Sequence, residues 1–557
     1  MHASRLALTF AVLGLVGAAA CSPAAPAAPP AAAPTAASSA TSAPAATNAP
    51  AANAAGASLG SRTLIIDNAY SFTTKDTDPD HGGVDFDADP FFHAVYDTLL
   101  TFKPGDTTNP QPLVAASYSV SPDAKTFTFK LRQDVKFSDG TPLKAADVAF
   151  SYNRLLNLHD TPVYLLDGVT SVSAPDDYTF VISTKDPNPA IPFIVTNPAL
   201  GIVNSAVVKA HGGTDQPGAD KTDTAEDYFQ TASAGSGPYI MSAVTTSEMD
   251  LKANPNYWGP NKPNFQTVVY RSVAAPTQLI EIQKATDQVV LSLSGDQSQS
   301  LQSNTKLQVN SFTSPNLTFA YVNENPDVLS FGANPHFISA VRYGIDYDAL
   351  VQVAGAGAAQ AAGVVPPQFL GALPASDAVH RDLARAKNEL QASGIANPAV
   401  QLSYSTSTTG ITEAEAAKIQ ANLAEVGITT TLDGQPSAIA TPNYRGGKNQ
   451  MGLFGWAPDY PDPNDYLPFL PDQLVGKRAG WLAAADPTLV DAGNKAASTA
   501  DIQSRGQQFQ AIQRTLNESS PIFPLLNAGQ SVVSTKNLTH VDYSPVWYID
   551  FAAIGSN

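Results

Sequence analysis

The sequence predicts an α/β protein with mixed sheets and at least two domains, and three observations lead to this fold class. The chain has 557 residues, of which 43% are apolar and 14% charged, so it can bury a substantial core but is too long for a single one. Alternating strand patterns dominate its first half, and helical patterns become frequent beyond about residue 330. A strand–helix–strand unit in the second half predicts a partly parallel sheet.

The first half contains four clear strand patterns. In TFTFKLR, strict alternation places three apolar side chains on one face. After the turn SDGTP, an apolar stripe at helical spacing predicts a helix that starts with Thr141 as its N-cap and Pro142 at its first position. The expected strands are TLIIDNAY (63–70), TFTFKLR (126–132), YTFVIST (178–184) and TVVYRSV (267–273).

Two helices are expected in the second half. RDLARAKNELQASG (381–394) carries an apolar stripe and stops at Gly394, a good helix terminator. TEAEAAKIQANLAEVG (412–427) has the spacing of a capping box, formed by Thr412 and Glu415, and stops at a glycine. The strand-like segments QLSYSTS and ITTTL flank this second helix and complete the β-α-β unit.

The N-terminus has the pattern of a secretory signal. The apolar run from Leu6 to Ala20 is too short for a permanent membrane span, and it leads through small residues to Cys21, the only cysteine. This end resembles a bacterial lipobox, with Ala18 where a larger residue is usual, so residues 1–21 are expected to be a lipoprotein signal with Cys21 as the lipidated residue. The alternative is ordinary signal cleavage beside an incidental cysteine. Residues 22–61, almost entirely Ala, Pro, Ser and Thr in their first part, are expected to be a disordered tether.

Charge and motifs exclude several function classes. The net charge of −18 argues against a nucleic-acid partner, whose phosphates require basic patches. The sequence has no H-E-x-x-H, C-x-x-C or Walker loop, and its eight histidines show no paired zinc spacing, so neither a cofactor nor a catalytic metal is expected.

An acidic stretch, DTDPDHGGVDFDADP (76–90), leaves a calcium site open. Asp76, Asp78, Asp80 and Asp87 stand at positions one, three, five and twelve of a calcium loop, but His81 stands where such a loop needs glycine. A solvated acidic turn, or part of the rim of a cleft, is therefore the favoured interpretation of residues 76–89.

The densest stretch of the chain is FGWAPDYPDPNDYLPFLPD (454–472), which combines five prolines with aromatic and acidic residues. Because proline fixes φ and removes backbone donors, an ordinary helix or central strand is excluded there, and a rigid loop is expected. Asp459 and Asp462 have a spacing that suits acid–base chemistry, but a stiff rim loop explains them equally well.

Several segments, taken in order, resemble family 5 extracytoplasmic solute-binding proteins, the dipeptide- and oligopeptide-binding lipoproteins of ABC importers. The resemblance extends over essentially the whole chain from about residue 62. The segments that carry it are VYDTLL (95–100), LVAASYSVSPDAKTFTFKLRQDVKFSDGTPLKAADVAFSYNRLL (113–156), SGPYIMS (236–242), LKANPNYWG (251–259), VRYGIDYDALV (341–351), IQANLAEVGI (419–428) and ESSPIFPLLNAG (518–529).

This resemblance implies a two-lobed periplasmic-binding-protein-like fold of class II, which closes on its ligand like a flytrap. It implies a lobe I of residues 62–312 plus 528–557, with an extra domain inserted at 93–228, and a lobe II of residues 313–527. The chain is expected to cross between the lobes near Ser314–Asn323 and near Ile522–Leu526, and a ligand that contacts both lobes would stabilise the closed state.

The resemblance also implies a binding site, because FGWAPDY matches the ligand-facing loop of peptide-binding members. Asp459 stands where the family's aspartate accepts a peptide ammonium, Trp456 would wall a side-chain pocket, and Gly455 and Ala457 would pair with the ligand backbone. Further expected contacts of the ligand are Tyr460 in this loop and Tyr164, Gly83 and Val84 in lobe I. Leu453 stands where some members have an arginine for the peptide carboxylate, which leaves open whether Arg445 takes that role or whether nothing does.

The predicted function is that of a monomeric binding protein without chemistry of its own. It would be held by its lipid to the outer face of the bacterial cytoplasmic membrane and would deliver peptides to an ABC permease. One alternative is a non-peptide solute, such as a nickel chelate, a sugar, an opine or an antibiotic. Others are a secreted hydrolase that uses the Asp459 and Asp462 region, or a signalling or structural lipoprotein with a vestigial cleft.

Overall fold

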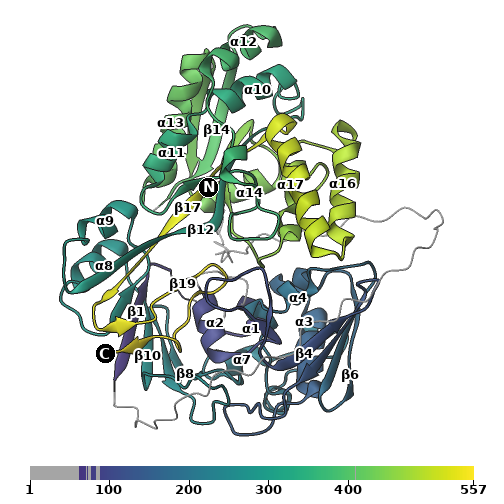
Figure 1. Cartoon of the computed structure of the whole chain (residues 1–557), viewed down its shortest axis with the longest axis vertical. Coiled ribbons are helices and arrows are strands. Elements are labelled where there is room, and N and C mark those ends of the chain that lie inside the picture. Colours follow the sequence, from purple (N-terminus) through teal and green to yellow (C-terminus); the bar gives the residue numbers. More distant parts are fainter. Residues whose placement is uncertain (1–61, 71, 73–76, 83–87, 408) are drawn as a thin grey trace, which may run out of the picture.

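The computed structural model describes residues 62–557 except 71, 73–76, 83–87 and 408. The predicted signal, Cys21 and the predicted tether lie outside the described residues. Figure 1 shows two lobes, one carrying α10 to α14, α16 and α17 and the other carrying β1, β8, β10 and α1 to α4. No helix of the described residues has both the length and the apolar character that crossing a membrane would require.

One large mixed sheet runs through both lobes. Its strands follow the order β15 (Thr429–Gln435), β14 (Ala399–Ser405), β16 (Met451–Trp456), β12 (Leu307–Val322), β17 (Ile522–Thr535), β11 (Gln288–Val290), β1 (Thr63–Asn68), β10 (Thr267–Ser272), β9 (Glu248–Ala253) and β8 (Tyr239–Val244), with β13 (Ala359–Gln360) paired to β17.

The long strands β12 and β17 connect the two lobes. β12 pairs with β16 from Leu317 to Val322, while β17 pairs with β11 through Val533 and Ser534. Their mutual register is interrupted between Thr313 and Leu317. We propose that the lobe boundaries lie at 312/313 and 527/528, beside this irregularity, and we use the names lobe I and lobe II in that sense.

A smaller antiparallel sheet forms most of the region proposed as the inserted domain. Its order is β4 (Ala115–Val120), β5 (Thr126–Leu131), β7 (Thr179–Thr184) and β6 (Val169–Asp176), and α3 (Ala145–Leu158) contacts β6 and β7.

The four strands expected in the first half are confirmed as β1 and β10 of the large sheet and β5 and β7 of the small one. Phe127 and Phe129 of β5 are fully buried, as the alternation predicts.

The predicted start of α3 is wrong by a few residues. Thr141 does not cap a helix, because its amide and its hydroxyl both donate to the Asp139 carboxylate and close a turn. The helix starts at Ala145 instead, where the Asp147 side chain accepts a hydrogen bond from the Lys144 amide.

The β-α-β unit of the second half is confirmed. β14 and β15 pair in parallel, and α13 (Ile411–Val426) connects them, while α12 (Leu383–Ser393) precedes β14. The two helices end at Gly394 and Gly427, both of which adopt positive φ. The predicted capping box is wrong: α13 has no side-chain cap, and Glu415 is 4% exposed, while the Glu413 carboxylate instead accepts hydrogen bonds from Ser407.

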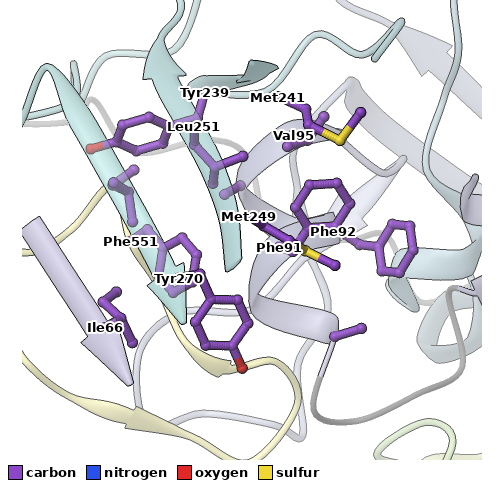
Figure 2. Packing of buried hydrophobic residues seen from close by; sticks show 14 of the residues in the cluster. Ile66, Phe91, Phe92, Val95, Tyr239, Met241, Met249, Leu251, Tyr270 and Phe551 are labelled. Atoms are coloured by element: carbon purple, nitrogen blue, oxygen red, sulfur yellow. The ribbon is translucent and has the colours of Figure 1, made fainter. Parts of the chain in front are cut away.

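The main core of lobe I includes the C-terminal segment. Figure 2 shows Phe551 beside Tyr270, with Ile66, Met249 and Leu251 on neighbouring strands. Phe551 packs edge-on against Tyr270, with ring centroids 5.5 Å apart. The last residues of the chain therefore return to lobe I, which supports assigning 528–557 to it.

The other helices and small strands fill the remaining surface of both lobes. The helices are α1 (Pro79–Gly82), α2 (Asp89–Val95), α4 (Ile191–Ile194), α5 (Ser205–Ala210), α6 (Ala219–Thr222), α7 (Glu226–Phe229), α8 (Ala275–Glu281), α9 (Gly295–Ser300), α10 (Pro335–Gly344), α11 (Tyr347–Ala354), α14 (Ser437–Arg445), α15 (Leu474–Arg478), α16 (Pro487–Ser498) and α17 (Ile502–Ser519). The 3-10 helices are η1 (Thr161–Leu166), η2 (Pro198–Leu200), η3 (Ala375–Asp377), η4 (Pro463–Phe469) and η5 (Ala483–Ala485), and the short strands are β2 (Leu100–Thr101), β3 (Gln111–Pro112), β18 (Leu538–Thr539), β19 (Tyr543–Ser544), β20 (Tyr548–Ile549) and β21 (Gly555–Ser556).

Candidate functional site

The proline-rich loop of lobe II follows a central strand and is anchored by a buried ion pair. β16 ends at Trp456, before Pro458, and the loop continues into η4. Asp462 caps η4 by accepting a hydrogen bond from the Asn464 amide at 2.9 Å. Its carboxylate also pairs in bidentate fashion with Arg505 of α17, with one bond of 2.7 Å, and the sequence did not predict this contact. The loop is therefore fixed to the body of lobe II.

The strand segment that precedes the loop is open along one edge. β14 accompanies β16 only as far as Leu453, whereas β12 pairs with Gly455 and Trp456 on the other side. Gly455 and Ala457 are both exposed. A Cβ built on Gly455 would meet only the Leu317 carbonyl oxygen, at 3.8 Å. The described strands thus leave one edge of Gly455 available for an extended ligand to pair with.

Asp459 lies where the two lobes meet. Its side chain is partly buried and receives a hydrogen bond from the hydroxyl of Tyr164, which belongs to η1 in lobe I. Asn197 of lobe I donates to the Asp459 carbonyl oxygen at 2.6 Å. Burial raises the pKa of the Asp459 carboxyl to about 6, although its hydrogen bonds with Tyr164 and Asp465 oppose the shift. The structure therefore brings together two of the predicted site residues, Asp459 and Tyr164, from opposite lobes.

Asp465 is hydrogen-bonded to both Trp456 and Asp459. Its Oδ2 accepts hydrogen bonds from the Trp456 indole nitrogen at 3.1 Å and from the Asp459 amide at 3.3 Å. The Trp456 ring packs edge-on against Phe469, with centroids 5.4 Å apart, so its orientation is fixed from two sides.

Tyr460 contacts the opposite lobe. It packs against an aromatic cluster of lobe I formed by Phe102, Phe193 and Trp547. This contact and the two hydrogen bonds at Asp459 connect the loop of lobe II to lobe I. A further bridge is the hydrogen bond of 2.6 Å from the Thr107 hydroxyl to the Gln368 carbonyl oxygen.

The acidic stretch near residue 80 is neither solvated nor arranged as a calcium loop where the structure describes it. Asp78 and Asp80 are buried and bind the guanidinium of Arg154, whose side chain is fully buried, at 2.6–3.0 Å. Asp223 completes the cluster with a bond of 2.8 Å. The solvated turn is thus corrected for these two residues, whose carboxylates pair with an arginine from α3. No group of three or more His, Cys, Asp or Glu side chains that could hold a metal ion occurs among the described residues.

His81 connects this buried cluster to the helix that carries Tyr164. Its ring bonds with Asp160, the N-cap of η1, whose carboxylate also accepts the Thr161 amide. Although burial opposes protonation, the hydrogen bond with Asp160 and the negative charges of Asp78 and Asp160 raise the pKa of His81 to about 9. Two predicted ligand contacts, Gly83 and Val84, lie outside the described residues.

Leu453, which replaces the arginine of some family members, and Arg445, the residue that could take its role, differ in their surroundings. Leu453 is 1% exposed and belongs to the core of lobe II. Arg445 is the last residue of α14 and is exposed. The role of Arg445 in binding stays a prediction.

Sequence reasoning missed three residues of the site. Arg505 lies far from the loop in sequence, and Asn197 stands in no recognisable motif. Asp465 was visible in the acidic loop, but its hydrogen bonds depend on how the chain folds back between Trp456 and η4.

Two α/β lobes connected by paired long strands, with a proline-rich loop at their junction, define a periplasmic-binding-protein fold. The model of the bacterial extracellular solute-binding proteins, family 5 (middle region), matches residues 109–473. The chain belongs to this family, and it is accordingly a solute-binding protein and not an enzyme.

Individual relatives agree with this assignment. The chain is 24% identical over 461 residues to the probable D,D-dipeptide-binding periplasmic protein DdpA of Escherichia coli, a match that covers 81% of this chain and 86% of that protein. It is 26% identical over 449 residues to the glutathione-binding protein GsiB of Escherichia coli, covering 77% and 82% of the two chains. Among solved structures, the ABC transporter substrate-binding protein CtaP of Listeria monocytogenes is similar in fold, with a TM-score of 0.77, 19% identity and coverage of 89% and 99%.

Proposed function

We propose that this protein is an extracytoplasmic receptor that captures peptides with a free amino terminus between its lobes and delivers them to an ABC permease. The observation that carries the proposal is the position of Asp459, whose carboxylate lies at the junction of the lobes and receives hydrogen bonds from Tyr164 and Asp465. Within the described part of the chain, no ion pair includes Asp459. A cationic group of a ligand therefore has an acceptor there.

The chemistry of this acceptor favours an ammonium group. An ammonium held by a partly desolvated carboxylate gains a charge-assisted hydrogen bond of roughly 1.5–3 kcal/mol. The unpaired edge at Gly455 supports an extended peptide rather than a compact solute, because a peptide backbone offers the donors and acceptors that a strand edge binds. Two relatives whose names specify a dipeptide and glutathione support the same ligand class.

The test combines identification of the ligand with a matched set of variants. Native mass spectrometry of the purified protein identifies the bound solute, and calorimetric titration compares peptides with free and with acetylated amino termini. We expect acetylation, or Asp459→Asn, to weaken binding by about tenfold or more. Asp472→Asn is the control, because Asp472 ends the same stretch but has a side chain 41% exposed that pairs with Lys477. Equal affinity for the free and acetylated forms would refute the ammonium role.

The second candidate ligand is a non-peptide solute, such as an opine, a sugar or a nickel chelate. The same mass measurement distinguishes it from a peptide. Recovery of such a compound in place of a peptide would replace the proposed ligand while leaving the binding function intact.

We further propose that Cys21 carries the lipid anchor and that the protein acts as a monomer. The Ala- and Pro-rich segment that follows Cys21 supports a flexible tether between an anchor and the folded lobes. Cys21→Ser is expected to release the full chain from the membrane fraction, whereas the wild-type chain stays with it. Release of both would refute lipid attachment.

A further inference from the structure

The carboxyl groups of Asp459 and Asp465 form a contact that the proposed function does not by itself explain. Asp465 Oδ2 accepts the Asp459 amide at 3.3 Å, which holds the two side chains next to each other, and a side-chain hydrogen bond with Asp465 is one of the causes that lower the pKa of Asp459. The side chain of Asp465 is deeply buried, with the residue 5% exposed, whereas Asp459 retains partial exposure at the lobe junction. Two carboxyl groups that share a site repel each other strongly when both are ionised.

Hydrogen bonding requires that the pair hold one proton, and the surroundings decide which residue keeps it. A carboxylate has no donor, so a bond between two carboxyl groups exists only when one of them is protonated. Burial disfavours charge, which places the negative charge on the better-solvated Asp459 and the proton on Asp465. On Asp465, Oδ2 is occupied by the Trp456 indole and the Asp459 amide, which leaves Oδ1 to carry the proton.

We infer that Asp459 and Asp465 act as an acid–carboxylate pair, in which Asp465 stays protonated and donates a hydrogen bond to the Asp459 carboxylate. Asp465 thereby positions Asp459 and Trp456 for a ligand that carries one ammonium group. This inference rests on the proposed function for the identity of the ligand, but the state of the pair does not depend on it. Asp465 is a positioning residue, since it acts through its two neighbours.

The other groups that face the pair leave this arrangement undisturbed. Tyr164 donates to Asp459, and burial raises the pKa values of Tyr460 and Tyr466 well above 10, so both stay neutral. Asp462, the next carboxylate along the loop, is neutralised by Arg505. Burial and the charge of Asp459 raise the pKa of Asp465 well above its ordinary value, in agreement with the geometry, while the pKa of Asp459 is raised to about 6.

The pair sets both the charge and the pH range of the site. With one proton bound, the site presents a single negative charge, which matches one ammonium. Because Asp459 must be ionised to bind it, affinity is expected to be full only well above pH 6 and to fall as the pH drops through that value. Removal of the hydrogen bond from Asp465 would raise the pKa of Asp459 further and shift this loss to higher pH.

Two substitutions at Asp465 separate the proposed role from ordinary packing. In Asp465→Asn, the amide oxygen still accepts the Trp456 indole and the Asp459 amide, and the amide nitrogen donates to the Asp459 carboxylate as the acid does. We expect its affinity for a free-amine peptide to stay within about threefold of wild type, with the same pH profile. Asp465→Ala removes all of these bonds, so we expect a loss of about tenfold or more and a profile shifted to higher pH. Equal losses in both variants, with equal profiles, would overturn the inference.

An infrared measurement tests the proton directly and needs no ligand. At pH 8, the difference spectrum between wild type and Asp465→Asn should contain the carbonyl band of a protonated carboxylic acid, and Asp472→Asn should give no such difference. A difference spectrum that shows only an ionised carboxylate would refute the pair. If this band is present but free and acetylated peptides bind equally, the proposed function fails while the inference about the pair holds.

Discussion

The ion pair between Asp462 and Arg505 makes a quantitative prediction about the stability of the loop. The side chains are 0% and 1% exposed, and the contact is bidentate. Arg505→Met keeps much of the apolar stem but leaves the Asp462 carboxylate buried with the Asn464 amide as its remaining partner. Breaking a buried pair from one side costs about 3–5 kcal/mol, far more than its net contribution to folding, because the surviving charge is uncompensated.

Urea unfolding followed by tryptophan fluorescence measures this cost. We expect Arg505→Met to lower the free energy of unfolding by about 3–5 kcal/mol at pH 8. The double variant Asp462→Asn with Arg505→Met removes both charges and should recover most of the loss.

Arg514→Met is the matched control, because Arg514 lies on the same helix, pairs with Asp377 at 2.8 Å and has a side chain 48% exposed. An exposed pair of this kind contributes about 0–1 kcal/mol. If Arg505→Met and Arg514→Met unfold at the same urea concentration, the argument from burial is wrong.

Three further predictions concern the site and its surroundings. Tyr164→Phe removes a hydrogen bond to Asp459, so calorimetry should show ligand affinity about 2- to 10-fold weaker with an unchanged urea midpoint; a changed midpoint with unchanged affinity would contradict this role. Asp160 and the neighbouring charges raise the pKa of His81 to about 9. Protonated His81 therefore stabilises the fold by up to about 3 kcal/mol, an effect that is complete below pH 6.5 and is lost as the pH rises through 9. His81→Gln should flatten the dependence of the unfolding free energy on pH, and an unaltered slope would argue against the pairing of His81 with Asp160. A side chain at position 455 would contact little of the protein, so Gly455→Val should leave the free energy of unfolding unchanged but weaken peptide binding about tenfold or more. Unchanged affinity would exclude a close approach of the ligand backbone.

Much of the fold could be predicted because the sequence patterns that indicate it are either local, as in single strands and helix ends, or consist of family-like segments along the whole chain. Alternation within TFTFKLR (126–132) is enough to predict β5, and the glycines after α12 and α13 mark helix ends, where both adopt positive φ. The cap of α3 failed because two aspartates compete there: Asp139 binds Thr141 in a turn, and Asp147 binds the Lys144 amide. Sequence spacing does not decide between such nearby donors and acceptors.

The candidate site was predictable only in part for a related reason. The resemblance of FGWAPDY to a ligand-facing loop pointed to Asp459 and Trp456, which lie three positions apart in one short segment. The residues that hold them are distant or folded back: Asn197 is 262 positions from Asp459, and Arg505 is 43 positions from Asp462. Contacts of this length are set by the packing of the two lobes, which no local pattern encodes.

If Asp459 binds the ligand as proposed, its position couples ligand recognition to closure of the lobes. Its amide is held by Asp465 of lobe II, whereas its carboxylate and carbonyl oxygen are reached by Tyr164 and Asn197 of lobe I. An ammonium bound there interacts with a group that both lobes orient only when they are together. A ligand shifts an equilibrium between open and closed forms only by its difference in affinity for the two, and this arrangement supplies such a difference. Because Tyr460 adds an apolar contact with lobe I that needs no ligand, closure does not depend on the ligand alone. Under the proposed function, the same short loop would therefore set which solute is bound and how strongly binding closes the protein.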